Sequence, residues 1–228
     1  MVKLASVFFM LATLLLPIAQ PISLSEGSEE DRIFSIVQKM ESAFKAVEDY
    51  TCEVDQIFYR DGVTDQHYRF KFYFKRDKKV RVDFSSPYRG LSIFYSEGDK
   101  DATVAPFRFV PTLKFRFSID NPMIKTLAGQ RIDQTDMGYF IQFISKNLKG
   151  VKQREDEFYE SGDQVTFLLW AMDYIEERYL EKYRITISKK NWLPTHIERY
   201  NLEGKPIEST DIKKYTVNTH LEDKLFHP

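Results

Sequence analysis

The stretch YRFKFYFKRDKKVRVDF, residues 68–84, alternates between apolar or aromatic side chains and charged ones. In its first half Phe70, Phe72 and Phe74 fall on one side of an extended chain, while basic residues fall mainly on the other. After a basic turn the alternation resumes, with Val82 and Phe84 on the apolar side. A repeat of two residues is typical of half-buried strands. The stretch therefore predicts a β-hairpin with one apolar face and one basic face.

Similar strand patterns continue on both sides of this hairpin, separated by turn signals such as Asp61-Gly62 and Glu203-Gly204. Their short, regular spacing is typical of an antiparallel meander, and we predict roughly eleven strands in all. The expected strands cover residues 50–60, 68–75, 79–85, 91–96, 102–110, 112–118, 151–160, 164–172, 181–188, 192–200 and 206–217.

Two parts of the chain follow a helical repeat instead. Apolar residues recur every three or four positions from Ile33 to Val47, which predicts an amphipathic helix over about residues 29–48. In mid-chain, Asn121 before Pro122 is a favourable helix start, and a second apolar stripe covers about residues 136–148. The fold class that these patterns indicate is mainly β, of the α+β type, with one long and two short helices.

The N-terminal residues are typical of an export signal. Lys3 is followed by an apolar run over residues 4–16, which is short for a membrane span and matches the core of a signal peptide. Cleavage after Ala19 and cleavage after Ser25 both fit, and we prefer Ser25. We therefore expect a cleaved signal peptide over residues 1–25 and one soluble, exported domain over 26–228, because no change of composition marks a second domain.

Charge argues against nucleic acid as a partner. The chain of 228 residues has 33 basic and 34 acidic side chains, so it carries no global field that would attract nucleic acid or an anionic membrane. The basic and aromatic side chains of residues 68–84 also lie on opposite faces, so phosphate contacts and base stacking would not converge. We expect partners that are recognised by shape and apolar contact.

Motifs for catalysis or metal binding are absent from the sequence. The four histidines are isolated, and no zinc-binding spacing, nucleophile elbow or phosphate-binding loop occurs. Cys52 follows the pattern of a small buried hydrophobic residue, and Glu176-Glu177 lies in a charged stretch typical of a solvated surface. We expect no enzyme activity, no metal and no cofactor.

Several short motifs resemble those of the periplasmic lipoprotein carriers, LolA, and of the wider LolA/LolB-like superfamily. The first expected helix leads into a strand that carries Tyr50, Val54 and Gln56 at matching positions. Arg76 stands at the family's arginine in the hairpin turn, and Pro87 ends the next strand. The C-terminal pattern is similar as well, with matches at Gly204, Asn218, Leu221, Asp223 and Phe226.

This resemblance implies an unclosed antiparallel β half-barrel, covered by the long N-terminal helix and the short mid-chain helices, with an apolar cavity for acyl chains. It implies a latch at Arg76, whose carbonyl partners we expect among residues 121–150. The residues expected to contact the ligand are Phe70, Phe72, Phe74, Val82, Phe84, Met123, Leu127, Phe140 and Ile144.

The function that the resemblance implies is a periplasmic carrier, expected to be a monomer, that takes lipoprotein acyl chains or another lipid toward the outer membrane. Its partners would be an inner-membrane transporter and an outer-membrane acceptor. An alternative is an envelope-stress sensor or scaffold that binds a protein partner, and a third class is a hydrolase with a carboxylate or histidine cluster in the cavity. Composition alone does not decide between a hollow interior and a filled core.

Overall fold

The computed structural model describes residues 29–107, 109–110, 112–126, 129–148, 158–173 and 179–228. The predicted signal peptide, residues 1–25, lies outside the described residues and stays a prediction. The first described element is helix α1, Glu29–Lys45, in agreement with the helix expected over residues 29–48. Its apolar stripe includes Ile33, Val37 and Met40, which are all at most 2% exposed.

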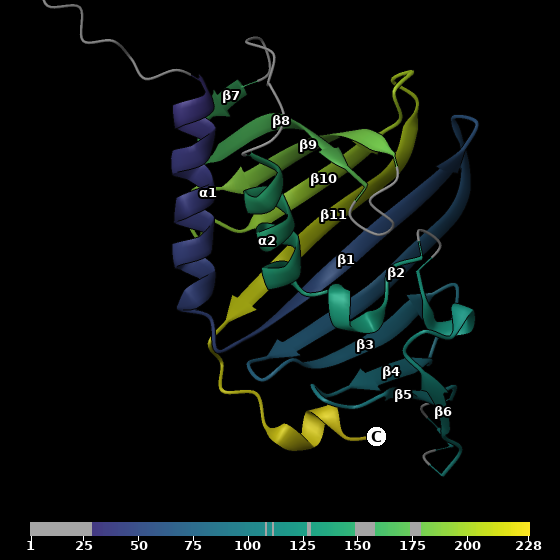
Figure 1. The fold of residues 1–228 in the computed structure, drawn as a ribbon. Coiled ribbons are helices and arrows are strands. Elements are labelled where there is room, and N and C mark those ends of the chain that lie inside the picture. The colour runs from purple at the N-terminus through teal and green to yellow at the C-terminus, as the bar shows by residue number, and fades with distance from the viewer. Residues whose placement is uncertain (1–28, 108, 111, 127–128, 149–157, 174–178) are drawn as a thin grey trace, which may run out of the picture.

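The described strands form one antiparallel sheet of 11 strands in the order β6-β5-β4-β3-β2-β1-β11-β10-β9-β8-β7 (Figure 1). The first and last strands therefore pair in the middle, and the sheet is not closed. This confirms the predicted mainly β fold with an unclosed half-barrel. The strands are β1 (Asp49–Arg60), β2 (Val63–Lys75), β3 (Lys79–Ser86), β4 (Ser92–Tyr95), β5 (Asp101–Ala105), β6 (Phe115–Ser118), β7 (Phe158–Ser161), β8 (Gln164–Met172), β9 (Leu180–Ser188), β10 (Pro194–Tyr200) and β11 (Pro206–Val217).

Some strand bounds differ from the expected ones. β2 starts at Val63, five residues before the aromatic alternation begins, and residues 63–65 are exposed. β5 ends at Ala105 and β6 begins at Phe115, so both are shorter than the expected segments 102–110 and 112–118. The expected strand over residues 151–160 is described only from Phe158 onward.

Helices α1 and α2 lie on one face of the sheet (Figure 1). Helix α2, Met137–Leu148, contacts both α1 and β8. A Cβ on Gly138 would overlap the ring of Phe44, so glycine allows the two helices to approach closely. The expected turn after Asn121 is the 3-10 turn η1, Pro122–Ile124, and the Asn121 side chain caps it by accepting a hydrogen bond from the Met123 amide at 2.9 Å. A second 3-10 turn, η2, Ile132–Gln134, precedes α2.

The hairpin of β2 and β3 has the two faces that its sequence predicts. Phe72 and Phe74 are each 4% exposed on the helix-covered face, paired with Val82 and Val80 in β3. On the opposite face the basic residues bind the C-terminal segment. Lys75 contacts Asp223 at 2.6 Å, and Arg81 donates to the carbonyl of Leu225 at 3.1 Å.

The C-terminal segment is anchored at both of its ends. Its 3-10 turn η3, Asp223–Phe226, places Phe226 at 2% exposure. Upstream of η3, Asn218 donates from its side-chain amide to the carbonyl of Ala46 at 2.9 Å and accepts a hydrogen bond from the Glu48 amide at 2.7 Å. The end of α1, the start of β1 and the end of β11 are thereby held together.

Candidate functional site

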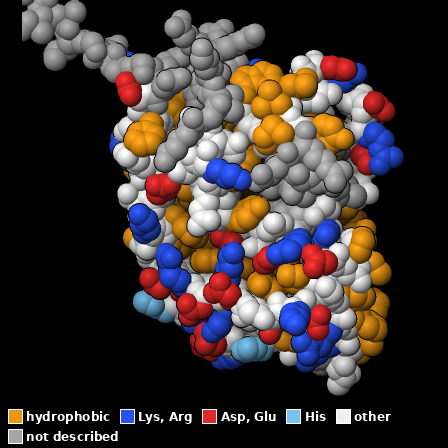
Figure 2. Space-filling view, viewed as in Figure 1, with side chains coloured by type: hydrophobic (Ala, Val, Ile, Leu, Met, Phe, Trp, Pro, Cys, Tyr) orange, Lys and Arg blue, Asp and Glu red, His pale blue; other side chains and the backbone are white. Residues whose placement is uncertain are grey.

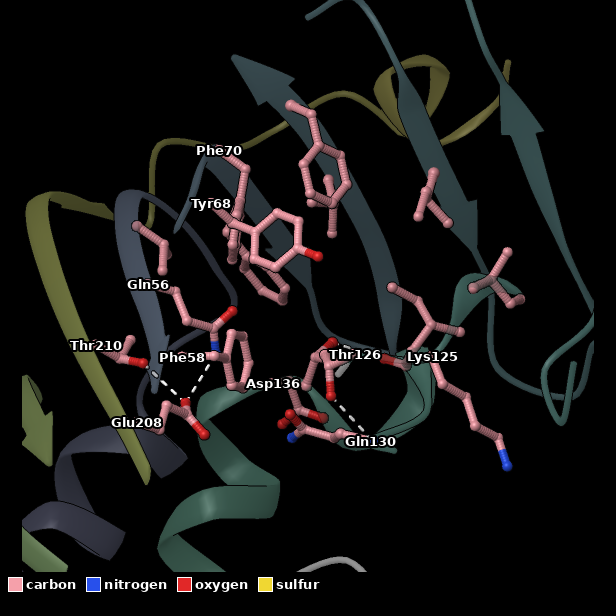
Figure 3. Close-up of a pocket in the computed structure, with 18 of the residues that line it drawn as sticks. Gln56, Phe58, Tyr68, Phe70, Lys125, Thr126, Gln130, Asp136, Glu208 and Thr210 are labelled. Atoms are coloured by element: carbon pink, nitrogen blue, oxygen red, sulfur yellow. Dashed lines mark hydrogen bonds between the residues drawn. The ribbon is translucent and has the colours of Figure 1, made fainter. Parts of the chain in front are cut away.

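A cavity of about 560 Å³ lies between the sheet and the segment that contains η1, η2 and the start of α2 (Figure 3). This volume falls inside the range of about 300–1,000 Å³ that is usual for small-molecule sites. Residues of β1 to β5, β10 and β11 form its floor, and residues between Pro122 and Phe140 form its roof. The interior is therefore hollow beneath η1, η2 and the start of α2, whereas it is filled beneath the rest of α2.

Aromatic side chains of adjacent strands form much of the floor. The rings of Phe70 and Phe84 lie 5.5 Å apart, and Tyr68 lies 6.2 Å from Phe84 and 6.0 Å from Phe58. These distances are typical of packed aromatic pairs. Tyr88 contacts Tyr68 and is 53% exposed, so the aromatic surface continues from the interior to the rim.

The structure brings together most of the predicted ligand residues. The six that line the cavity are Phe70, Phe72, Val82, Phe84, Met123 and Phe140. Met123 is 78% exposed, which places it at the rim. Phe74 and Ile144 do not line the cavity; they are 4% and 0% exposed within the packed core. Leu127 lies outside the described residues.

A buried ionic cluster also reaches the cavity wall and was missed from the sequence. Arg199 in β10 is 4% exposed, and its guanidinium contacts Glu181 at 2.8 Å and Glu208 at 2.7 Å. Glu208 also accepts hydrogen bonds from Gln56 at 2.8 Å and from Thr210 at 2.9 Å (Figure 3). A buried charge of this kind is tolerated only when it is paired and hydrogen-bonded, as these groups are.

Asp136, directly before α2, is a second polar residue of the wall that was not among the predicted ligand residues. It is 4% exposed, and its Oδ1 accepts a hydrogen bond from the Tyr139 amide at 3.1 Å, as an N-cap residue does. Its Oδ2 is buried and has no hydrogen-bond partner among the described residues. Burial raises the pKa of this carboxyl, against the opposing effect of the amide hydrogen bonds.

Arg76 donates hydrogen bonds to carbonyl oxygens, as expected, but these belong to the end of α1 and not to the mid-chain helices. Its guanidinium donates to the carbonyl oxygens of Phe44 at 2.8 Å and Lys45 at 2.9 Å, and its Nε donates to that of Val47 at 2.9 Å. The expectation of partners among residues 121–150 is therefore wrong. The register of β1 with β2 places Lys75 opposite Asp49, which brings the hairpin turn beside the end of α1.

Cys52 and the histidines, which were the described candidates for nucleophilic or acid-base chemistry, do not meet in the cavity, and Glu176-Glu177 lies outside the described residues. Cys52 lines the cavity, but burial raises the pKa of its thiol to about 12, which suppresses the thiolate. His67 and His196 pair with Asp55 at 2.6 Å and Asp211 at 2.7 Å, and neither histidine lines the cavity. Within the described ranges, no group of three or more potential ligand side chains could hold a metal ion.

The sequence matches no protein-family model, and no curated protein is detectably similar to it in sequence. Solved structures are similar in three dimensions. An uncharacterized conserved protein from Thermus thermophilus matches with a TM-score of 0.53 and 10% identity, over 86% of this chain and 93% of that chain. A LolA superfamily protein from Nitrosomonas europaea matches with a TM-score of 0.40 and 15% identity, over 86% of this chain and 97% of that chain.

A chain of the MucA/MucB complex from Pseudomonas aeruginosa is also similar, with a TM-score of 0.46 and 9% identity, over 85% of this chain and 60% of that chain. At such identities the likeness concerns the fold alone. The unclosed antiparallel sheet with α1 and α2 on one face is the architecture that the sequence resemblance implied. None of the described helices has the length and apolar character needed to span a membrane.

Proposed function

We propose that this chain is a non-enzymatic carrier that shields acyl chains of a lipoprotein, or of another lipid, during transfer between membranes. The observation that carries the proposal is the cavity of about 560 Å³ with an aromatic floor and a helical roof. Six of the nine residues expected from the sequence to contact ligand line this cavity, so the sequence resemblance and the cavity geometry both support the proposal.

The physical need for such a carrier follows from the hydrophobic effect. Each CH₂ group that leaves water is worth about 0.8 kcal/mol, so a chain of about sixteen carbons costs on the order of 12 kcal/mol to expose. The apolar side chains of Val54, Phe70 and Phe72 offer the surface that an acyl chain requires. A lipid held there would cross an aqueous compartment at a much lower cost.

The proposal includes a compartment and partners. The signal-like N-terminus favours export to the periplasm, where a carrier would receive lipid from an inner-membrane transporter and pass it to an outer-membrane acceptor. The described lining contains no histidine, and its cysteine is a protonated thiol. Of its two carboxyl groups, Asp136 caps α2 and Glu208 pairs with Arg199, an arrangement that favours binding over hydrolysis. We therefore propose that the chain acts without catalysis.

A cavity-filling variant tests this function. Val54 lines the cavity at 9% exposure, whereas the side chain of the neighbouring Glu53 points to solvent and is 51% exposed. We expect Val54→Trp to lower the affinity for a pyrene-labelled fatty alcohol at least about tenfold, because the indole occupies the space of the chain. The matched control Glu53→Trp should bind like wild type. Equal affinity in all three proteins, or no binding to wild type, would contradict the proposal.

A second candidate function is binding of a protein partner at the β6 edge of the sheet. Phe107, Phe109 and Phe115 are 45%, 83% and 46% exposed near this edge, and Figure 2 shows hydrophobic side chains along the lower right margin of the molecule. An exposed strand edge can pair with an extended peptide. If this surface is the functional one, Phe115→Ser should abolish partner capture while leaving lipid binding unchanged, and Val54→Trp should do the reverse.

A further inference from the structure

The Asp136 carboxyl has one oxygen in use and one oxygen available. Its Oδ1 caps α2, while its Oδ2 is buried and has no partner among the described residues. A buried acceptor without a hydrogen bond costs free energy, and such groups in native proteins call for an explanation. Asp136 belongs to the cavity lining, and Figure 3 shows its side chain among the other lining residues. A bound ligand could therefore supply the missing donor.

Glu208, the other carboxylate of the cavity wall, has hydrogen-bond partners on both of its oxygens. Glu208 accepts from Arg199, Gln56 and Thr210, and Arg199 is held in turn by Glu181. That cluster is complete without a ligand. Among the described lining residues, Asp136 is thus the carboxylate with a buried oxygen left to accept a hydrogen bond.

Tyr50 places a hydroxyl on the same part of the wall. Its oxygen accepts a hydrogen bond from the Met137 amide at 3.1 Å, and Met137 follows Asp136 in the chain. Burial, together with neighbouring Cys52 and Asp136, raises the pKa of Tyr50 well above its ordinary value, so the hydroxyl keeps its proton. Asp136 as acceptor and Tyr50 as donor would suit a neutral group that both donates and accepts.

We propose that Asp136 determines ligand specificity, by accepting a hydrogen bond from a neutral N–H or O–H donor next to the acyl chain. An acyl amide or an acyl chain that ends in a hydroxyl has this chemistry. A fatty-acid carboxylate does not, and it would place a negative charge beside Asp136. This inference rests on the proposed function, since it assigns a role to one residue of the same cavity.

Two matched probe pairs test the inference. N-methyldodecanamide keeps one N–H that N,N-dimethyldodecanamide lacks, and dodecanol keeps the O–H that methyl dodecyl ether lacks. Leaving a buried carboxyl oxygen without a hydrogen bond costs enough free energy that wild type should prefer the donor of at least one pair by about tenfold. If wild type prefers the donor-bearing probe only in the amide pair, the ligand's donor is an amide N–H. If it does so only in the alcohol pair, the donor is a hydroxyl. A preference in both pairs would show that Asp136 accepts from any neutral donor.

The variant Asp136→Asn replaces the oxygen that has no partner by an NH₂ group, which donates hydrogen bonds instead of accepting them. The remaining amide oxygen can still cap α2. We expect the variant to remove the preference for the donor-bearing probe and to leave the affinity for the donor-free probe unchanged. Asp77→Asn is the matched control, because Asp77 is exposed in a turn at φ 64°, a conformation that asparagine also adopts.

Equal binding of donor-bearing and donor-free probes by wild type would overturn the inference while leaving the carrier proposal intact. A preference that survives Asp136→Asn would also overturn it, since another group would then be the acceptor. Failure of wild type to bind all four probes and the pyrene-labelled alcohol would instead remove the proposed function, and this inference with it.

Discussion

Arg76, in the turn between β2 and β3, donates from Nη2 to the carbonyl oxygen of Phe44 at 2.8 Å, near the end of α1. The last carbonyls of a helix have no partner within the helix and carry partial negative charge, so a guanidinium beside them is stabilising. The side chain also lies over the Phe44 ring, 5.7 Å from its centre. Arg76 therefore caps α1 and joins it to the aromatic hairpin.

Replacement of Arg76 by methionine should lower the free energy of unfolding by about 1–2 kcal/mol, because charge-assisted hydrogen bonds are lost from a partly screened site. Urea unfolding measures this. Arg60→Met, at a side chain that is 75% exposed, should change the free energy by less than about 0.5 kcal/mol. An Arg76→Met protein as stable as wild type would contradict the capping role. A changed rate of ligand release in a folded variant would support a latch in addition.

The cluster at Arg199 should be far more sensitive. Arg199→Met would leave Glu181 and Glu208 buried at 7% and 4% exposure without their cation, and breaking a buried pair in this way costs about 3–5 kcal/mol. The control Arg184→Met removes a partly exposed partner of Glu198 in the adjacent strand and should cost less than about 1 kcal/mol. Similar midpoints of chemical unfolding for the two variants would argue against the cluster's structural role.

The Cys52 thiol should be unreactive in the folded protein. With its pKa raised to about 12 from 9.0, the thiolate fraction near neutral pH falls by about a thousandfold, and the side chain is only 3% exposed. Iodoacetamide labelling followed by mass spectrometry should therefore proceed only as fast as the protein unfolds, and bound lipid should slow it further. Rapid labelling of native protein would show that the thiol is accessible through the cavity.

The burial of Asp136 predicts a pH dependence of stability. Because its pKa is raised in the folded protein, the folded state binds the proton more readily than the unfolded state does. Stability should therefore fall as pH rises from the ordinary value of 3.8 through the folded pKa, and stay reduced above it. The melting temperature of wild type should fall relative to Asp136→Asn over this window. Parallel curves for the two proteins would contradict the assignment.

The strand pattern predicted the fold well because alternation over residues 68–84 leaves little freedom in register. A slip by one residue would have placed the phenylalanines in water and the basic residues in the core. The same pattern could not separate Phe72, which lines the cavity, from Phe74, which packs in the core. That difference depends on where the helices lie along the strand, and alternation carries no such information.

The polar part of the site was not predicted, because inward-facing positions of the strands were expected to be apolar. In β10 and β11, Arg199 shares its face with Ile197, and Glu208 shares its face with Ile212. Charged residues of opposite sign at inward positions of two adjacent strands could have predicted a buried ion pair. The partner of Arg76 could also have been predicted. β1 follows α1 directly and pairs with β2 along its length, so the turn after β2 lies beside the end of α1.

Native mass spectrometry of protein purified without detergent, followed by organic extraction, tests whether the cavity holds lipid. We expect wild type to carry an acyl lipid that is released on extraction, and Val54→Trp to carry much less of it. Delipidated wild type should take up N-methyldodecanamide. A bare protein mass for wild type, together with no uptake of any acyl probe after extraction, would rule out a lipid carrier.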